Sequence, residues 1–156
     1  MLKVFTASCL ILLATTVWPA GDISQGQALI SAAMMGHVQE VKDLLAQGVD
    51  ANSKNAAGRS ALHLAAFNGN ALTVQALISA GADVDMVDGR GSTALMDAAA
   101  FGHAKVVTLM IQGGVNVNTK DQAGNNALSL AIKTRHEHVV KLLEAAGAVK
   151  TEESPK

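Results

Sequence analysis

The sequence predicts an all-α fold in which four helical repeats stack into a solenoid. The first observation is a period of 33 residues, with landmarks at Leu29, Leu62, Leu95 and Leu128, at Ala32, Ala65, Ala98 and Ala131, and at Gly48, Gly81, Gly114 and Gly147. The second is that each period contains two short segments with apolar residues at helical spacing and a glycine after each. A helix pair of this size cannot bury its own apolar face, so successive pairs are expected to stack.

Composition is consistent with one folded domain of this kind. Of the 156 residues, 49% are hydrophobic and 16% are charged, which is typical of a globular protein and not of a disordered one. The formal net charge of −1 provides no overall attraction to phosphate groups, so we expect no nucleic-acid partner. Aromatic residues make up only 3%, which leaves Ala, Leu and Val to fill the core between close helices.

Residues 1–20 have the layout of a secretory signal peptide. Lys3 provides a positive start, residues 4–17 form a nearly continuous apolar run, and Trp18-Pro19-Ala20 closes it. The run is shorter than the roughly 20 residues that a membrane-spanning helix needs, which favours cleavage. An uncleaved membrane anchor is the alternative. Cys9, the only cysteine, lies inside this run, so a cleaved chain would contain no thiol and no disulfide.

The repeat domain is expected to span residues 21–150, with residues 151–156 as a short polar tail. The first repeat has an atypical start, where Ser24 and Gln27 match the spacing of a capping box. The last repeat carries Glu144 where earlier repeats have an apolar residue and Arg135 where they have glycine, so it is predicted to cap the stack. The four repeats are predicted at about residues 24–54, 55–87, 88–120 and 121–150.

One period shows how the local sequence specifies each element. Ser60 is suited to cap a short Ala-rich helix, which Gly69 ends in a left-handed turn. A second helix follows over residues 70–80. Residues 82–91 are short, extended and rich in Asp and Gly, which predicts an exposed hairpin-like finger.

These residues resemble the ankyrin repeat family. Residues 88–103 read D-G-R-G-S-T-A-L-M-D-A-A-A-F-G-H, and residues 55–70 read N-A-A-G-R-S-A-L-H-L-A-A-F-N-G-N. The match covers roughly residues 24–150. The family's proline is replaced by alanine in three repeats, and only His63 keeps its histidine. The resemblance implies a helical solenoid that binds other proteins.

No motif for catalysis or a cofactor stands out. His37, His103 and His136 occupy the start of the second helix, where an imidazole is expected to bond neighbouring backbone, and stacked helices lie too far apart for such histidines to share a metal ion. His63 and Asp97 are the one pair that resembles a catalytic dyad, but no nucleophile accompanies them. We therefore expect a structural polar pair or no contact, no cofactor, no metal and no enzymatic activity.

In ankyrin repeats, partners usually contact the finger tips and the solvent-facing end of the first helix. Phe67 and Phe101, the only aromatic residues after residue 20, fall at such positions beside Met34 and Met35. These side chains either form an exposed apolar stripe for a partner or fold inward as core. Basic residues on or near the fingers either indicate a partner with an acidic rim or are solvated surface charges without a partner. The candidate partner-binding residues are Met34, Met35, Lys54, Arg59, Phe67, Asn68, Arg90, Ala100, Phe101, Lys120 and Lys133.

Together, these features predict a non-catalytic protein-protein interaction module in the periplasm or outside the cell. We expect it to be a monomer and to bind another protein. Small exported ankyrin proteins are sometimes associated with oxidative-stress enzymes such as catalase, and the resemblance implies such a partner. The alternative is a membrane-tethered accessory subunit held by residues 3–17.

Overall fold

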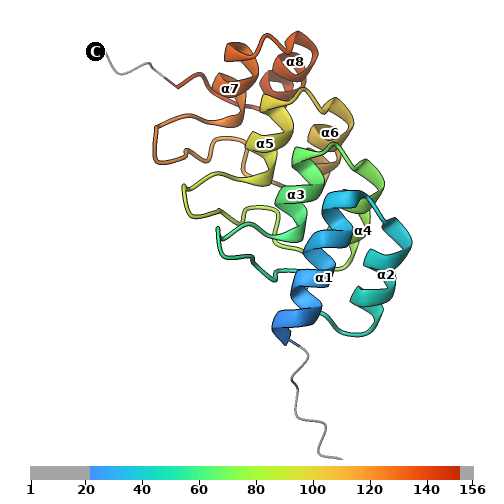
Figure 1. Cartoon of the computed structure of the whole chain (residues 1–156). Coiled ribbons are helices and arrows are strands. Elements are labelled where there is room, and N and C mark those ends of the chain that lie inside the picture. The colour runs from blue at the N-terminus through green and yellow to red at the C-terminus, as the bar shows by residue number, and fades with distance from the viewer. Residues whose placement is uncertain (1–21, 152–156) are drawn as a thin grey trace, which may run out of the picture.

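The structure is a computed structural model that describes the backbone of residues 22–151 and the side chains of residues 25–151. This part of the chain forms eight α-helices arranged as four pairs (Figure 1), which confirms the predicted all-α solenoid. The helices are α1 (Asp22–Met35), α2 (Val38–Ala46), α3 (Ala61–Phe67), α4 (Ala71–Ser79), α5 (Ala94–Ala100), α6 (Ala104–Gln112), α7 (Ala127–Lys133) and α8 (Glu137–Ala145).

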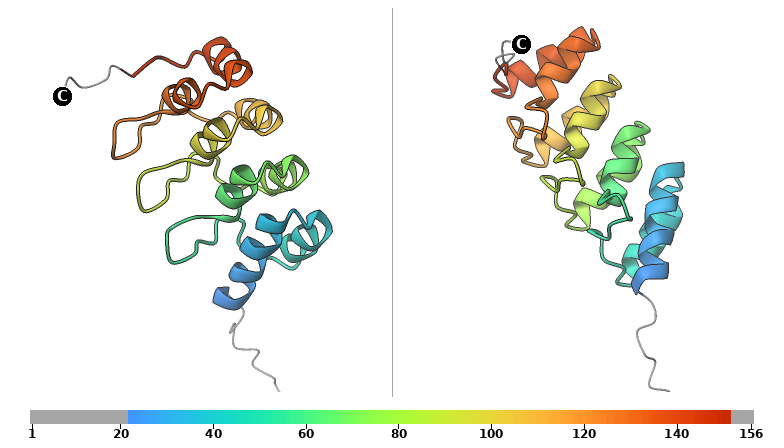
Figure 2. Two further views of the ribbon diagram at one scale, coloured as in Figure 1. Left: turned by 45° about the horizontal axis from the view of Figure 1, so that its top comes forward. Right: turned by 60° about the vertical axis from the view of Figure 1, so that its left-hand side comes forward.

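The helices form two layers. The first helix of each pair packs on the first helix of the next, so that α1, α3, α5 and α7 make one layer, and α2, α4, α6 and α8 make the other. Three loops project from the side of the first layer and follow one another along the stack (Figure 2). We call these loops the fingers: finger 1 is residues 47–60, finger 2 is 80–93 and finger 3 is 113–126.

The first helix of each inner repeat is short because strong local signals bound it at both ends. Ser60, Thr93 and Asn126 occupy the cap positions before α3, α5 and α7, and Thr93 Oγ1 accepts the backbone N–H of Met96 at 3.3 Å. After α3, Gly69 has φ = 72°, the left-handed conformation predicted from the sequence. A Cβ at this position would also lie 2.6 Å from the His103 ring.

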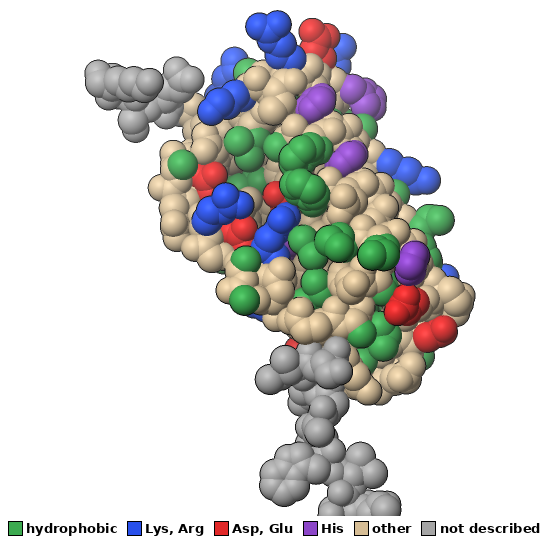
Figure 3. Space-filling view, in the orientation of Figure 1, with side chains coloured by type: hydrophobic (Ala, Val, Ile, Leu, Met, Phe, Trp, Pro, Cys, Tyr) green, Lys and Arg blue, Asp and Glu red, His purple; other side chains and the backbone are tan. Residues whose placement is uncertain are grey.

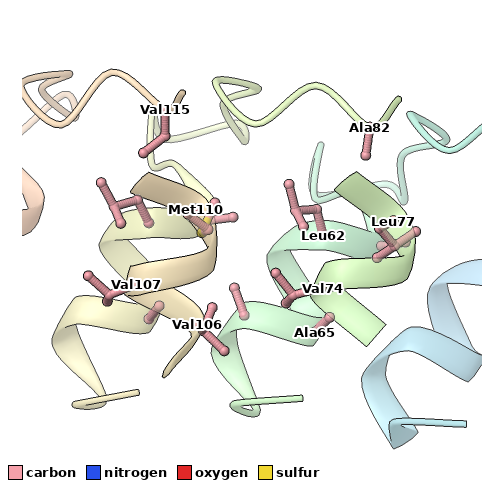
Figure 4. Close-up of a cluster of buried hydrophobic side chains, with 14 of the residues drawn as sticks. Leu62, Ala65, Val74, Leu77, Ala82, Val106, Val107, Met110 and Val115 are labelled. Atoms are coloured by element: carbon pink, nitrogen blue, oxygen red, sulfur yellow. The ribbon is translucent and has the colours of Figure 1, made fainter. Parts of the chain in front are cut away.

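The core lies between the two helix layers and continues from repeat to repeat. Figure 4 shows two neighbouring repeats, where Leu62, Val74 and Leu77 of one repeat and Val107 and Met110 of the next are all buried. Three alanines at equivalent positions are completely buried where consecutive first helices meet, and their small side chains permit the close approach of those helices. These alanines are Ala33, Ala66 and Ala99.

Hydrogen bonds to main-chain groups also join the repeats. In finger 2, the Asp88 carboxylate accepts the backbone N–H groups of Arg90 and Ser92 at 2.8 and 2.9 Å, which fixes the turn. Neighbouring fingers connect where Gly89 donates its N–H to the carbonyl of Ala57 at 3.1 Å. Three further side chains 33 residues apart each accept a backbone N–H of the following repeat at 2.7–2.8 Å, namely Asn52, Asp85 and Asn118.

The start of the first repeat differs from the prediction. The chain is already helical at Asp22, so Ser24 lies within α1 and is not its cap. Gln27 instead reaches finger 1, where its side-chain amide donates to the carbonyl of Lys54 at 3.5 Å. The predicted signal peptide at residues 1–20 and residues 152–156 of the polar tail lie outside the described residues. No helix within residues 22–151 is both long and apolar enough to cross a membrane.

Candidate protein-binding surface

The fingers and the first helices together form the surface on which the candidate residues lie, here called the inner surface. Figure 3 views this side of the molecule: hydrophobic side chains gather over the first helices, with charged side chains beside them toward the fingers. The candidates come from all four repeats, because equivalent positions recur along the stack.

An aromatic pair lies near the middle of the inner surface. The Phe67 and Phe101 rings, from the ends of α3 and α5, meet edge to face with centroids 4.5 Å apart. Phe101 is 51% exposed, and Phe67 is partly exposed. Met34 and Met35 at the end of α1 are 43% and 62% exposed. Of the two arrangements that the sequence left open, the structure therefore has the one in which these side chains face solvent, and not the one in which they fold into the core.

The His103 imidazole contacts both members of this aromatic pair. Its ring stacks on Phe101 with centroids 6.3 Å apart, and its Nε2–H donates to the carbonyl of Phe67 at 3.0 Å. One histidine thus contacts both phenylalanines. Asn70, at the equivalent position one repeat earlier, donates to the carbonyls of Ala33 and Met34, each at 3.1 Å. The predicted backbone role of this position is confirmed for His103, whereas the His37 imidazole contacts the Glu40 carboxylate.

Arg59 lies in a different environment from the other basic candidates. Its guanidinium forms an ion pair with the Asp97 carboxylate, and each of the two side chains is only 17% exposed. The same guanidinium lies over the Phe67 ring, 5.2 Å from the centroid. Arg59 therefore holds Phe67 in place and is not a free surface charge. The exposed basic candidates are Lys54, Arg90, Lys120 and Lys133.

The remaining two candidates lie beside the aromatic pair at the ends of the same helices. Asn68, the residue that ends α3, is exposed, and its side-chain amide donates to the carbonyl of Leu64 at 3.0 Å. Ala100 is half-buried next to Phe101.

His63 and Asp97 have separate partners in place of a catalytic dyad. His63 Nδ1 accepts the backbone N–H of Ser60 at 3.3 Å, and its Nε2–H donates to the carbonyl of Ser92 at 3.0 Å. Burial lowers the pKa of His63, against the opposing effect of its bond to Ser92, so the imidazole is held neutral. Burial also raises the pKa of Asp97, even though Arg59 opposes this shift. His63 thus joins α3 to the end of finger 2.

The contacts of this site that sequence reasoning missed include the Arg59–Asp97 ion pair and the stacking of His103 on Phe101. The ion pair joins neighbouring repeats across 38 residues of sequence, the stacking joins two residues of one repeat, and both depend on side-chain direction. Comparison of the repeats offered one signal for the ion pair. Arg59 is replaced by Ser92 one repeat later, and among the residues equivalent to Asp97 in the four repeats only Asp97 is acidic. Within the described residues, no group of three His, Cys, Asp or Glu side chains is arranged to hold a metal ion.

Comparison with protein families agrees with this architecture. The family of ankyrin repeats (3 copies) matches residues 8–88 and 68–153, which together cover most of the sequence. The chain belongs to the ankyrin repeat family. Proteins with ankyrin repeats are generally non-catalytic modules that bind other proteins, so the fold identifies a protein-protein interaction module. A search of curated proteins gave no significant match.

Proposed function

We propose that this chain binds its partner protein on the inner surface, with Phe67 and Phe101 as the anchor. The observation that supports the proposal is an exposed aromatic pair held in one arrangement by buried or half-buried neighbours. Large aromatic side chains at the centre of a contact surface contribute most of the binding free energy in many protein complexes. A pair that is already ordered loses little conformational entropy when a partner covers it.

The neighbouring residues indicate what the partner offers. Met34 and Met35 extend the apolar area toward α1, and methionine side chains adapt to irregular partner surfaces. Exposed Lys54, Arg90 and Lys120 lie on the three fingers. The fingers also carry exposed Asp50, Asp83 and Asp85, so the proposed partner presents an apolar segment with acidic residues placed opposite the three cations. Charges of this kind mainly speed encounter and fix orientation, so binding is expected to weaken as salt is added.

The proposed location is the periplasm or the space outside the cell, with residues 1–20 removed as a signal peptide. The sequence pattern of those residues supports this proposal. An oxidative-stress enzyme such as catalase is the first partner to test, on the basis of the family resemblance. The second candidate function is a membrane-tethered accessory subunit that keeps the apolar run at residues 4–17. The N-terminal residue of the purified protein, determined by mass spectrometry, separates the two.

Affinity capture tests the proposed function. The exported form of the protein and its Phe67→Ala, Phe101→Ala variant are used side by side to capture partners from the exported fraction of the source organism. The matched control is Leu72→Ala, which removes a 61% exposed leucine from α4 in the other helix layer. We expect a partner that the wild type and the Leu72 variant retain and the double variant loses. Equal capture by all three proteins would rule out the aromatic pair as the anchor.

A further inference from the structure

The exposed end of the last repeat has a hollow that plays no part in the proposed function. Its volume is about 390 Å³, and it lies where a fifth repeat would otherwise stack on α7 and α8. Two apolar side chains and four charged ones line it: Ile132, Val140, Arg135, Glu137, Lys141 and Glu144.

Besides Glu144, two residues of this hollow depart from the repeat pattern. Ile132 occupies the position at which the three earlier repeats have a completely buried alanine, and it is 37% exposed. Arg135 occupies the position of a left-handed glycine and has φ = 62°, a backbone conformation that disfavours residues with a Cβ. A purely polar cap would not require the isoleucine. At the end of the stack, Ile132 is therefore a larger apolar side chain than the alanine of the repeat pattern, and Arg135 adds a cation where the pattern has glycine.

The bulk of Ile132 also decides which surfaces fit against this end. In the inner repeats, alanine at this position allows the next first helix to approach closely. An isoleucine in its place obstructs the same approach. A regular repeat, including the first repeat of another copy, would not fit in the usual stacking geometry, so endless head-to-tail stacking is disfavoured.

The charges of the hollow are complementary to those of the same hollow on another molecule. Glu137, Lys141 and Glu144 are spaced four and three residues apart and so lie along one face of α8. Two α8 helices can pack antiparallel about a twofold axis that crosses them at the height of residue 139. Lys141 of each helix then lies opposite Glu137 of the other. If the axis crosses the helices at a height between residues 142 and 143, Lys141 of each lies opposite Glu144 of the other instead. Either arrangement forms two reciprocal ion pairs around the apolar floor.

We propose that the hollow at the C-terminal end of the stack binds the same hollow of a second copy, forming a tail-to-tail dimer. A twofold contact closes on itself, which agrees with the obstruction of further stacking. Six lining side chains are far fewer than the roughly 20–30 residues per partner of a standard stable interface, so the dimer is weak. The inner surfaces are separate from this contact, and each copy keeps its own.

Sedimentation velocity tests the dimer over a range from about 10 µM to about 1 mM. The protein is purified after expression of the full chain, and its N-terminus is determined by mass spectrometry. We expect the average mass to rise from that of one chain toward that of two. Lys141→Glu should weaken association at least tenfold, because both reciprocal ion pairs become repulsive. The matched control is Lys105→Glu, the same charge change at an exposed position of α6, and it should associate as the wild type does.

A mixing experiment makes the test independent of the position of the axis. Lys141→Glu makes the hollow acidic at all three α8 positions, and a Glu137→Lys, Glu144→Lys variant makes it basic at all three. Each variant alone should remain a monomer, whereas an equimolar mixture should form dimers at least as tightly as the wild type. Recovery in the mixture also shows that both variants are folded. A wild type that stays monomeric throughout, or variants that fail to associate on mixing, would overturn the proposal and leave the hollow to another partner or to water.

Discussion

Arg59 shows how one side chain can belong both to the fold and to the binding surface. It lies one residue before the end of finger 1, pairs with Asp97 of the next repeat and lies over Phe67 of its own repeat. The sequence placed it among the free cations of the fingers, because its position alone does not reveal the carboxylate 38 residues later. Its contribution is therefore to hold the aromatic anchor in place, whereas Lys54, Arg90 and Lys120 remain available to a partner.

A second residue, Thr73, points to a simple way to stabilise the protein. It is completely buried in α4, and its hydroxyl oxygen lacks a hydrogen-bond partner within the described structure. The equivalent residues of the next two repeats are Val106 and Val139. Thr73→Val should raise the free energy of unfolding by about 1 kcal/mol, measured by urea denaturation, since a buried unpaired hydroxyl costs roughly 1–3 kcal/mol. Thr108→Val is the control: its hydroxyl donates to the Ala104 carbonyl, and this variant should gain nothing.

His63 makes stability depend on pH in a predictable direction. Burial holds its folded-state pKa below the ordinary value of 6.5, so between the two pKa values the unfolded chain binds more protons than the folded one. The contribution of His63 is fully present above about pH 6.5 and is lost as the pH falls through the lowered pKa. Asp97, whose pKa is raised above 3.8, acts in the opposite direction, because the folded chain binds its proton more tightly than the unfolded chain does.

Urea denaturation from about pH 7 to about pH 5 checks this prediction. The wild type should lose stability relative to His63→Gln as the pH falls, because the other histidines are common to both proteins. The comparison of slopes matters here, and not the absolute stabilities, because the variant also changes the hydrogen bonds to Ser60 and Ser92. Parallel slopes for the two proteins would contradict a lowered pKa for His63.

At the scale of one element, the end of α7 carries strain that the other first helices avoid. Arg135 has φ = 62° where α3 and α5 end in left-handed glycines. Arg135→Gly should therefore stabilise the dilute, monomeric protein by about 0.5–1 kcal/mol in thermal or urea unfolding. Gly102→Ala, one repeat earlier, should destabilise it, because the new Cβ would lie 2.6 Å from the His136 ring. A loss of stability in Arg135→Gly would show that the arginine side chain contributes more than its backbone strain costs.

The spacing of the first helices supplies a related prediction. Ala99 of α5 is completely buried at the position where α7 has Ile132. Ala99→Ile should destabilise the protein by about 1–3 kcal/mol because it overpacks the junction between two repeats. Ile132→Ala, the reverse change at the free end, should be nearly neutral in urea unfolding of the monomer. Equal effects of the two changes would contradict the role of alanine in setting the repeat spacing.

Features that depend on residues close together in the sequence could be predicted, and features that depend on contacts between repeats could not. The helix pairs, the left-handed glycine after α3 and the position of Ser60 at the start of α3 are confirmed, since each depends on residues close in sequence. The Ser24 cap was wrong because α1 already includes that residue. The Phe67–Phe101 contact was not predicted, since it depends on the directions of side chains from two repeats.

At the scale of the whole molecule, each repeat contacts mainly its neighbours, so the stack holds its inner surface as a row of equivalent positions. The residues at those positions differ between repeats, so the polarity of the surface changes along the stack. They are methionines in the first repeat, phenylalanines in the second and third, and Lys133 in the fourth. The apolar part of a partner is therefore expected to cover the first three repeats. Leu72 and the rest of the second helix layer remain outside this contact.

Hydrogen–deuterium exchange of the chain bound to its captured partner tests whether the inner surface is the binding site. If the inner surface is the binding site, amides at the ends of α3 and α5 and in fingers 1 and 2 should exchange more slowly in the complex than in the free protein. The amides of α4 and α6 should be unchanged. Slower exchange confined to α4 and α6, with no change in the fingers and first helices, would show that the partner binds the second helix layer and not the inner surface.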